Sequence, residues 1–370
     1  IKDKRGRTVL MTALEENPNP DLVALLIQKG ALINDSDRDG VTPLMLATYK
    51  KVDSKIFKRL IQGGAQINAQ DAKGQTPLMW VALRNGDTEK ALLLIQNGAV
   101  IDQPDQAGIT PLMHAAGKSA NLVQVLFKSG ASVTAKDKAG RTPLIWAVQH
   151  KGPAEDLNWL IDYGADINAP DNQGLTPLMW AARTYKEPNA IAALIRRGAV
   201  IDKQDQTGMN ALMWAAKENP EPDVVLEFLK NRMDLKAADK QGHIPLWFAA
   251  KFNKNPQVMH LLVQQMTPEE LLQKRTDYRL FWAIAEKWPL ETIPYLIEQG
   301  ASIKTKNPDG RTVLIWAIMS NPDPELISLL IKKGVDINAV DRDGHSALFF
   351  ARELGQKENV KRLIKAGARL

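Results

Sequence analysis

The chain has 370 residues, of which 44% are hydrophobic and 24% are charged, and its formal net charge is +6. This balance is sufficient for a buried core, and no apolar run in the sequence is long enough to span a bilayer. Cysteine is absent, which excludes disulfides, cysteine-based zinc sites and thiol nucleophiles.

A short phrase recurs along the whole chain, and its fullest form, D-x-x-G-x-T-P-L-M-W-A, occupies residues 171–181. Eleven copies occur, and their glycines are 34 residues apart except for one step of 32 residues between Gly108 and Gly140. Thr276 stands where one of the glycines is expected. A period of this length predicts a solenoid of stacked repeats.

Each copy predicts the same series of elements. Asp and Gly three residues apart predict a turn, the following Thr predicts a helix cap, and Pro suits the first position of the helix. An invariant Leu follows, and three residues later comes a small residue in every copy except Val81, so a neighbouring helix can approach closely. A second apolar-patterned helix follows, such as residues 21–29, and a glycine such as Gly30 ends it.

These copies define one solenoid domain over residues 1–370, because each repeat contacts only its neighbours and one core grows with the array. The expected repeats lie near residues 3–36, 37–70, 71–104, 105–136, 137–170, 171–204, 205–238, 239–272, 273–306 (degenerate), 307–340 and 341–370, the last being a C-terminal cap. Of the net charge, +4 lies in the last twenty residues, where six basic and two acidic residues occur, and the other 350 residues carry +2. We interpret this as the polar outer face of a capping repeat and expect no nucleic-acid partner.

The pattern resembles the ankyrin repeat, in which a turn is followed by two antiparallel helices, with T-P-L in the first helix and G-A-x-x-N after the second. Residues 164–168 read G-A-D-I-N, and the resemblance covers essentially the whole chain. It implies an all-α solenoid with β-turn fingers. Two departures are present: the His that usually follows T-P-L is Met or another apolar residue, so its hydrogen-bond link should be missing, and most repeats are one residue longer than in the family, in the loop between the helices.

No catalytic constellation is present in the sequence. The five histidines have no metal-ligand spacing, no phosphate-binding loop occurs, and turns and helix ends account for the glycines. We interpret the recurring Asp as a turn-forming residue rather than as a row of metal ligands, and His243 and His345 as turn-tip residues exposed to solvent or a partner. We therefore expect no enzymatic activity, no cofactor and no metal.

Tryptophan occupies one repeat position, two residues after the invariant Leu, at Trp80, Trp146, Trp180, Trp214, Trp282 and Trp316. His114 and Phe350 occupy it elsewhere. Two interpretations are open: these side chains form the core between repeats, or they form a partly exposed ladder on the groove wall that anchors a partner.

The resemblance also implies a concave partner-binding face, formed by turn tips and by the residues after the small residue of the first helix. The apolar tips suggest an apolar stripe across the fingers, which is typical of an interaction surface. The candidate partner-binding residues are Val41, Tyr49, Gln75, Arg84, Ile109, Arg141, His150, Leu175, Arg183, Met209, Lys217, His243 and Phe252, together with Trp80, Trp146, Trp180 and Trp214.

The leading hypothesis is a monomeric, non-catalytic scaffold from a bacterium that grips a partner protein of unknown identity, for example as an immunity or inhibitor protein for an enzyme. The alternative is binding of a polyanion or cell-wall polymer through tip Lys and Arg residues and Trp. The absence of cysteine slightly favours an exported or periplasmic protein over a cytoplasmic one. The chain begins with Ile1 inside a repeat, so we expect that an N-terminal segment, a signal peptide or other residues, has been removed.

The pattern is interrupted over residues 232–280. Arg232 and Met266 stand where glycine ends the second helix elsewhere, and Thr267-Pro268-Glu269-Glu270 predicts a capped extra helix instead of a finger. A degenerate repeat and a bend or docking feature are both open interpretations.

Overall fold

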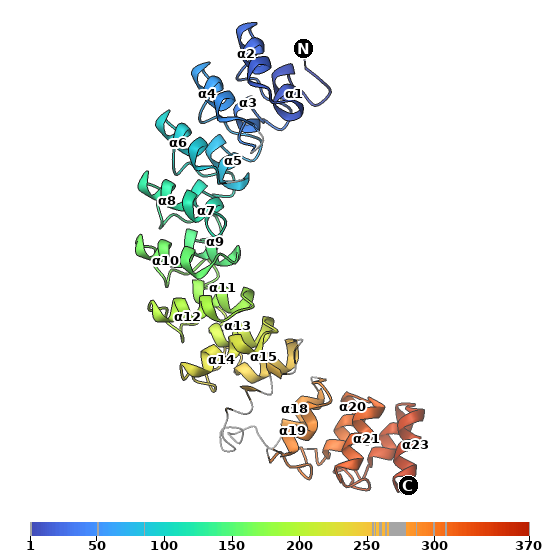
Figure 1. Ribbon diagram of the computed structural model, residues 1–370. Helices are drawn as coiled ribbons and strands as arrows, with labels where there is room; N and C mark the ends of the chain where they lie inside the picture. The colour runs from blue at the N-terminus through green and yellow to red at the C-terminus, as the bar shows by residue number, and fades with distance from the viewer. Residues whose placement is uncertain are drawn as a thin grey trace. The chain divides into compact units, whose positions relative to one another are not determined.

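The structure is a computed structural model that describes residues 2–49, 52–84, 86–253, 279–285, 287–298, 300–307 and 309–369, with a few single positions between 255 and 265. The described elements are helices joined by turns, and antiparallel bridges such as that between Lys2 and Thr8 are isolated (Figure 1). Among the described residues, no helix combines the length and the apolar character that a membrane crossing requires. The all-α fold with β-turn fingers is confirmed.

The chain divides into two compact units. Unit 1 covers Ile1–Gln206 and unit 2 covers Thr207–Leu370. The helices of unit 1 are α1 (Val9–Glu16), α2 (Pro20–Gln28), α3 (Pro43–Leu46), α4 (Ser54–Gln62), α5 (Pro77–Arg84), α6 (Thr88–Gln96), α7 (Pro111–Ala115), α8 (Ala120–Lys128), α9 (Pro143–Gln149), α10 (Ala154–Asp162), α11 (Pro177–Thr184) and α12 (Asn189–Arg196). Those of unit 2 are α13 (Ala211–Glu218), α14 (Pro222–Lys230), α15 (Pro245–Phe252), α18 (Arg279–Ala285), α19 (Thr292–Glu298), α20 (Val313–Ser320), α21 (Pro324–Lys332), α22 (Ala347–Glu353) and α23 (Lys357–Lys365).

The first helix of each repeat begins at the predicted cap. In α11 the Thr176 hydroxyl accepts a hydrogen bond from the backbone N–H of Met179, and Pro177 occupies the first helical position, where no N–H is needed. Methionine stands where the family usually has His after T-P-L, and its sulfur supplies a hydrogen bond of its own: Met45 Sδ accepts from the Thr42 N–H at 3.4 Å. In this copy both the side chain and the backbone N–H of the cap residue are therefore hydrogen-bonded to Met45.

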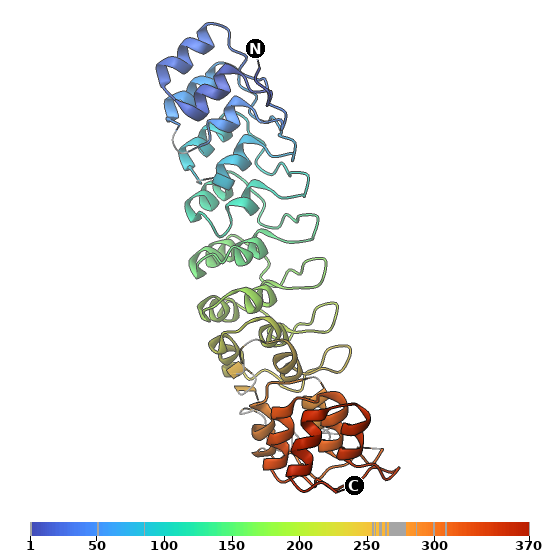
Figure 2. The same cartoon turned by 90° about the vertical axis from the view of Figure 1, so that its right-hand side faces the viewer.

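Neighbouring fingers are joined by backbone hydrogen bonds. The Gln106 N–H donates to the Lys73 carbonyl at 2.9 Å, and the Lys138 N–H donates to the Ala107 carbonyl at 3.0 Å. Gly108 lies between these contacts with φ +82, and a Cβ there would be 2.8 Å from the Lys138 nitrogen, so only glycine fits. Figure 2 shows the fingers of unit 1 projecting from the same side of the helices.

Asparagine side chains also join consecutive repeats. Asn68 donates to the Gly98 carbonyl at 2.9 Å and accepts from the Val100 N–H at 2.9 Å, and Asn168 repeats both contacts with Gly198 and Val200. This explains why the G-A-x-x-N pattern recurs at the repeat period: the side chain satisfies backbone groups of the following repeat.

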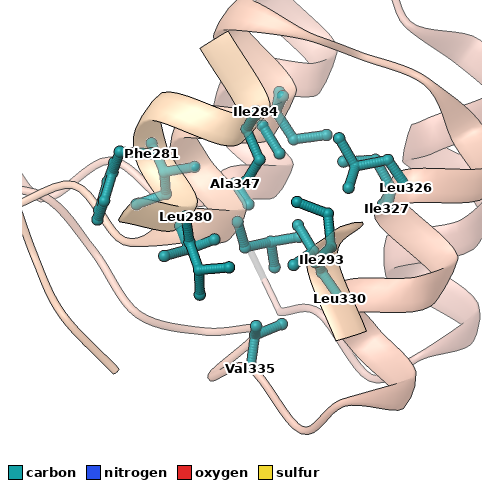
Figure 3. Packing of buried hydrophobic residues seen from close by; sticks show 14 of the residues in the cluster. Leu280, Phe281, Ile284, Ile293, Leu326, Ile327, Leu330, Val335 and Ala347 are labelled. Atoms are coloured by element: carbon teal, nitrogen blue, oxygen red, sulfur yellow. The ribbon is translucent and has the colours of Figure 1, made fainter. Parts of the chain in front are cut away.

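The core of unit 2 forms between the first and second helices of its last repeats. Leu280 and Ile284 of α18, Ile293 of α19 and Leu330 of α21 are buried together (Figure 3). Helices α18 and α19 thus supply both helices of the degenerate repeat near 273–306, although its turn phrase lacks the glycine.

Only part of the interrupted region lies among the described residues. Arg232 adopts φ 55, as the glycines at the other helix ends do, so the expected left-handed conformation is confirmed there. Met266 and the predicted capping box at 267–270 lie outside the described residues.

Candidate functional site

The finger turns are built by their aspartates. Asp71 Oδ1 accepts from the backbone N–H groups of Lys73 at 2.9 Å and Gln75 at 2.8 Å. The same pair of contacts occurs at Asp37, Asp105, Asp137, Asp171, Asp239 and Asp341. The recurring aspartates are therefore turn-forming, as predicted.

In three of these repeats the second carboxylate oxygen of the aspartate accepts a hydrogen bond from the tryptophan at the recurring position. Trp80 Nε1 donates to Asp71 Oδ2 at 2.9 Å, and Trp180 Nε1 donates to Asp171 Oδ2 at 2.9 Å. Trp146 makes the same bond to Asp137 at 3.0 Å. The indole thus fastens the finger to the first helix, a role that neither sequence interpretation included.

The tryptophans differ in exposure, so some fit the core interpretation and others fit the partly exposed one. Trp80 is 8% exposed and belongs to the core, whereas Trp146, Trp180 and Trp214 are half-buried. The three half-buried rings are part of a surface, but in Trp146 and Trp180 the polar edge of the indole is already engaged within the repeat.

Cationic side chains lie over these rings. Arg84 contacts two aromatic rings, with Cζ 4.6 Å from the Tyr49 ring centroid and 5.0 Å from that of Trp80. Arg183 lies over Trp180 at 4.7 Å. Such cation–π contacts stabilise the positions of the two arginines. We call the surface on which they lie the finger face of unit 1. It consists of the C-terminal ends of α3, α5, α7, α9 and α11 and the fingers at 37–41, 71–75, 105–109, 137–141 and 171–175.

The finger face contains an open cleft of about 610 Å³ between the second and third fingers. Val41 and Gln75 line it from the fingers, and Trp80, Leu83 and Arg84 line it from α5. Four of the predicted partner-binding residues are therefore brought together here, and Tyr49 lies against Arg84.

A buried lysine, which the sequence analysis missed, fixes the backbone of Tyr49. Lys90 of α6 is 1% exposed, and its Nζ donates to the carbonyls of Tyr49 at 2.9 Å and Val52 at 3.0 Å. Burial lowers the pKa of Lys90, and Asp87, with Oδ2 3.7 Å from Nζ, opposes this. No local pattern distinguishes Lys90 from the exposed lysines of other second helices.

Two predicted groove residues are engaged inside the fold. Arg141 lies over Trp146 at 4.4 Å, and its Nε donates to Asp137 at 2.8 Å while Nη1 donates to Gln149 at 3.1 Å. His150 donates from Nδ1 to the Ala116 carbonyl at 2.9 Å, and burial lowers the pKa of its imidazole. Both residues brace the repeat.

The expected apolar stripe across the finger tips is wrong for two of its members. Leu175 is 2% exposed and Met209 is 4% exposed, while Val41 and Ile109 are half-buried. Leu175 follows the finger glycine and directly precedes the helix cap Thr176, and its N–H donates to Asp171. This position therefore lies at the base of the finger rather than at its tip.

In unit 2 the predicted residues Trp214, Lys217, His243 and Phe252 form one cluster. Lys217 Nζ lies 4.7 Å from the Trp214 ring and 5.5 Å from that of Phe252, which is 45% exposed. His243 stacks at 3.7 Å on Trp247, a residue that the sequence analysis missed because it stands one position before the usual Trp position.

The second helices carry a further aromatic group that was not predicted. Phe127 stacks on Tyr163 at 3.7 Å, and Trp159 lies 5.6 Å from Tyr163. Trp159 is exposed. Trp159 lies in the second helix α10, outside the recurring tryptophan position of the first helices.

One group of potential metal ligands occurs in the described part of the chain. Asp341, Asp343 and His345 have ligand atoms within 4.8 Å of one another. Asp341 Oδ1 accepts from the backbone N–H groups of the other two residues, as in the other fingers, so the grouping is a consequence of the turn.

Three comparisons place the chain among known proteins. The crystal structure of the human ASB11 ankyrin repeat domain is similar over 62% of this chain and 99% of that chain, with a TM-score of 0.54 and 26% sequence identity. No curated protein matches the chain. The family model for ankyrin repeats in sets of three copies matches residues 1–71, 51–137, 78–171, 133–205, 178–272 and 280–370. The chain therefore belongs to the ankyrin-repeat family, whose members are typically non-catalytic and whose repeats generally mediate protein–protein binding.

Proposed function

We propose that this protein is a non-catalytic scaffold that grips a partner protein with its finger face. The observation that supports this most directly is the cleft beside Arg84, where apolar and charged side chains from two fingers and one helix converge. Arginine and aromatic residues at the centre of a surface are the side chains that dominate binding energy in protein interfaces.

A more specific version is that the partner is an enzyme that this protein inhibits, as an immunity protein does. The alternative, binding of a polyanion or cell-wall polymer, draws on the cations Lys73, Arg84 and Arg183 of the same face. The cations over the rings of Trp80, Trp146 and Trp180 favour the protein partner, because they cover faces on which a polymer would stack.

The test is partner capture from the lysate of the source organism with two matched double variants. Arg84→Ala with Arg183→Ala removes two cations from the finger face, and Arg59→Ala with Arg196→Ala removes two exposed cations from the second helices α4 and α12. We expect mass spectrometry to identify a protein that the wild type and the second-helix variant retain and the finger-face variant loses.

Retention by the finger-face variant together with loss from the second-helix variant would place the binding surface elsewhere and contradict the proposal. The captured protein, if it is an enzyme, is then assayed with and without the scaffold. Unchanged activity would remove the inhibitor version and leave the scaffold. Salt-sensitive binding to heparin or to cell-wall polymer without a protein partner would favour the alternative.

A further inference from the structure

The cleft at Arg84 has the features of a receptor for a carboxylate. Arg84 is exposed at the C-terminal end of α5, and its guanidinium contacts the rings of Tyr49 and Trp80, which come from consecutive repeats. A guanidinium that already packs on two aromatic rings has lost part of its rotational freedom before a ligand arrives, so less entropy is lost on binding. Its planar fork matches the two oxygens of a carboxylate.

The partners of Arg84 are themselves fixed. The Trp80 indole is bonded to Asp71, and the backbone carbonyl of Tyr49 accepts from the buried Lys90. The Trp80 ring and the backbone of Tyr49 are therefore anchored in the fold, and a binding residue that must hold its geometry needs such support.

Two carboxylates and two cations line the cleft. The Asp71 carboxylate accepts three N–H groups of its own repeat, so its charge is directed inward, and Asp39 is the exposed carboxylate at the rim. Lys73 lines the same cleft, and exposed Lys118 stands at the position of Arg84 in the next repeat. Within the cleft, Arg84 and Lys73 therefore face one exposed carboxylate, that of Asp39.

The surroundings favour a protein carboxylate over a nucleic acid. Single-stranded nucleic acids bind by stacking bases on aromatic faces, but Arg84 and Arg183 cover faces of Trp80 and Trp180. Val41 and Leu83 give the cleft an apolar component. The part of the chain before residue 351 also carries a net charge of only +2 of the total of +6.

We propose that Arg84 receives the carboxylate of an Asp or Glu side chain on an acidic segment of the partner protein, with an apolar side chain beside it against Val41 and Leu83. This inference rests on the proposed function, since it names the chemistry by which the finger face recognises its partner. Lys73 supplies a second positive charge at the edge of the same cleft.

The experiment is a double-mutant cycle with defined peptides. Twelve-residue peptides are selected from a random displayed library on the full chain, and each is resynthesised with its Glu or Asp replaced by Gln or Asn. Fluorescence anisotropy gives the affinity of each pair for the wild type, Arg84→Gln, Arg84→Lys and the control Arg59→Gln on α4.

We expect the loss of one acidic side chain to weaken binding to the wild type and to Arg59→Gln about tenfold, the effect of one good charged hydrogen-bonded pair, and to leave binding to Arg84→Gln nearly unchanged. Arg84→Lys keeps the charge but not the fork, so an intermediate loss is expected. Thermal unfolding of each variant separates lost recognition from lost folding.

Two results would overturn the inference alone: selected peptides without acidic residues, or equal losses with the wild type and Arg84→Gln. If heparin or a twelve-nucleotide single strand binds with the same dependence on Arg84 and displaces the peptides, the ligand is a polyanion and the inference also fails. Peptides whose binding is lost with Arg59→Gln and kept with Arg84→Gln would overturn the proposed function as well.

Discussion

At the scale of single residues, the turn aspartate explains why tryptophan recurs in this chain. One carboxylate oxygen closes the finger and the other accepts the indole N–H nine residues later, as in Asp171 and Trp180. Where Asn307 replaces the aspartate, Trp316 turns its Nε1 to the Phe281 carbonyl at 3.0 Å instead. The indole therefore needs an acceptor, and the aspartate is the stronger one.

This difference predicts unequal costs for the same substitution. Trp180→Phe removes a donor from the buried Asp171 carboxylate and should lower the free energy of unfolding by about 1 kcal/mol more than Trp316→Phe, whose lost bond goes to a neutral carbonyl. Both changes remove the same ring atoms, so Trp316→Phe is the control. Urea unfolding measures the two values, and equal losses would show that the bond to Asp171 adds nothing beyond packing.

Arg232, whose backbone is in the left-handed conformation, is a position where a substitution should raise the free energy of unfolding. A non-glycine residue at φ 55 is strained, so Arg232→Gly should raise the free energy of unfolding by about 1 kcal/mol. The matched change Lys230→Gly, in the last turn of α14, should lower it by about 0.5–1 kcal/mol because the helix interior disfavours glycine. Thermal unfolding checks both, and a neutral or destabilising Arg232→Gly would contradict the strain.

At the scale of elements, the helices and fingers could be predicted because their determinants are local. Thr176, Pro177 and the finger glycines act within a few residues of where they stand, and the repeat copies the signal many times. The contacts between repeats could not be predicted in the same way. Lys90 reaches carbonyls some 40 residues earlier, and its role depends on which loop lies beside α6.

The surroundings of the candidate partner-binding residues were predicted less completely for the same reason. Position in the repeat selected Arg84 and Tyr49, which the structure brings into contact, but it could not show that Arg141 and His150 are engaged internally or that Leu175 lies at the finger base. Burial is decided by the neighbouring repeat, and a pattern within one repeat does not contain that information.

Helix α7 carries a pH-dependent element of the fold. His114 takes the tryptophan position there, and burial lowers the pKa of its imidazole, with Asp105 opposing and Lys118 and His150 adding to the shift. Below about pH 6.5 His114 binds a proton in the unfolded chain before it does so in the folded protein. The free energy of unfolding therefore falls as the pH drops from there toward the pKa of His114 in the folded protein.

We therefore expect the wild type to lose more stability between pH 7.5 and pH 5.5 than His114→Phe, which places at α7 the residue found at the same position in α22. Chemical unfolding at the two pH values measures the difference. His150 is present in both proteins, so burial of its imidazole contributes to both pH dependences. Parallel pH dependences would show that His114 takes up its proton equally well in the folded and unfolded chain.

At the scale of the whole molecule, stability should be local because each repeat packs only on its neighbours. The cluster around Leu330 illustrates this: its buried members run from Leu280 to Leu363, all within unit 2. That the whole chain forms a single continuous solenoid remains our prediction. It can be tested by measuring how far unfolding spreads from one repeat to the next. Damage to one repeat should spread to adjacent repeats and fade with distance along the array.

Leu330→Ala tests this directly. Leu330 is fully buried in α21, so its truncation should cost about 2–5 kcal/mol and raise amide hydrogen exchange in α18 to α23. Exchange in α5 to α9 of unit 1 should stay as in the wild type, because no residue of the cluster around Leu330 comes from these helices. A surface change in the same helix, Lys332→Ala, serves as the control and should alter neither region. If exchange instead rises equally in α5 and α21, the chain unfolds as one cooperative body, and the nearest-neighbour description of its stability is wrong.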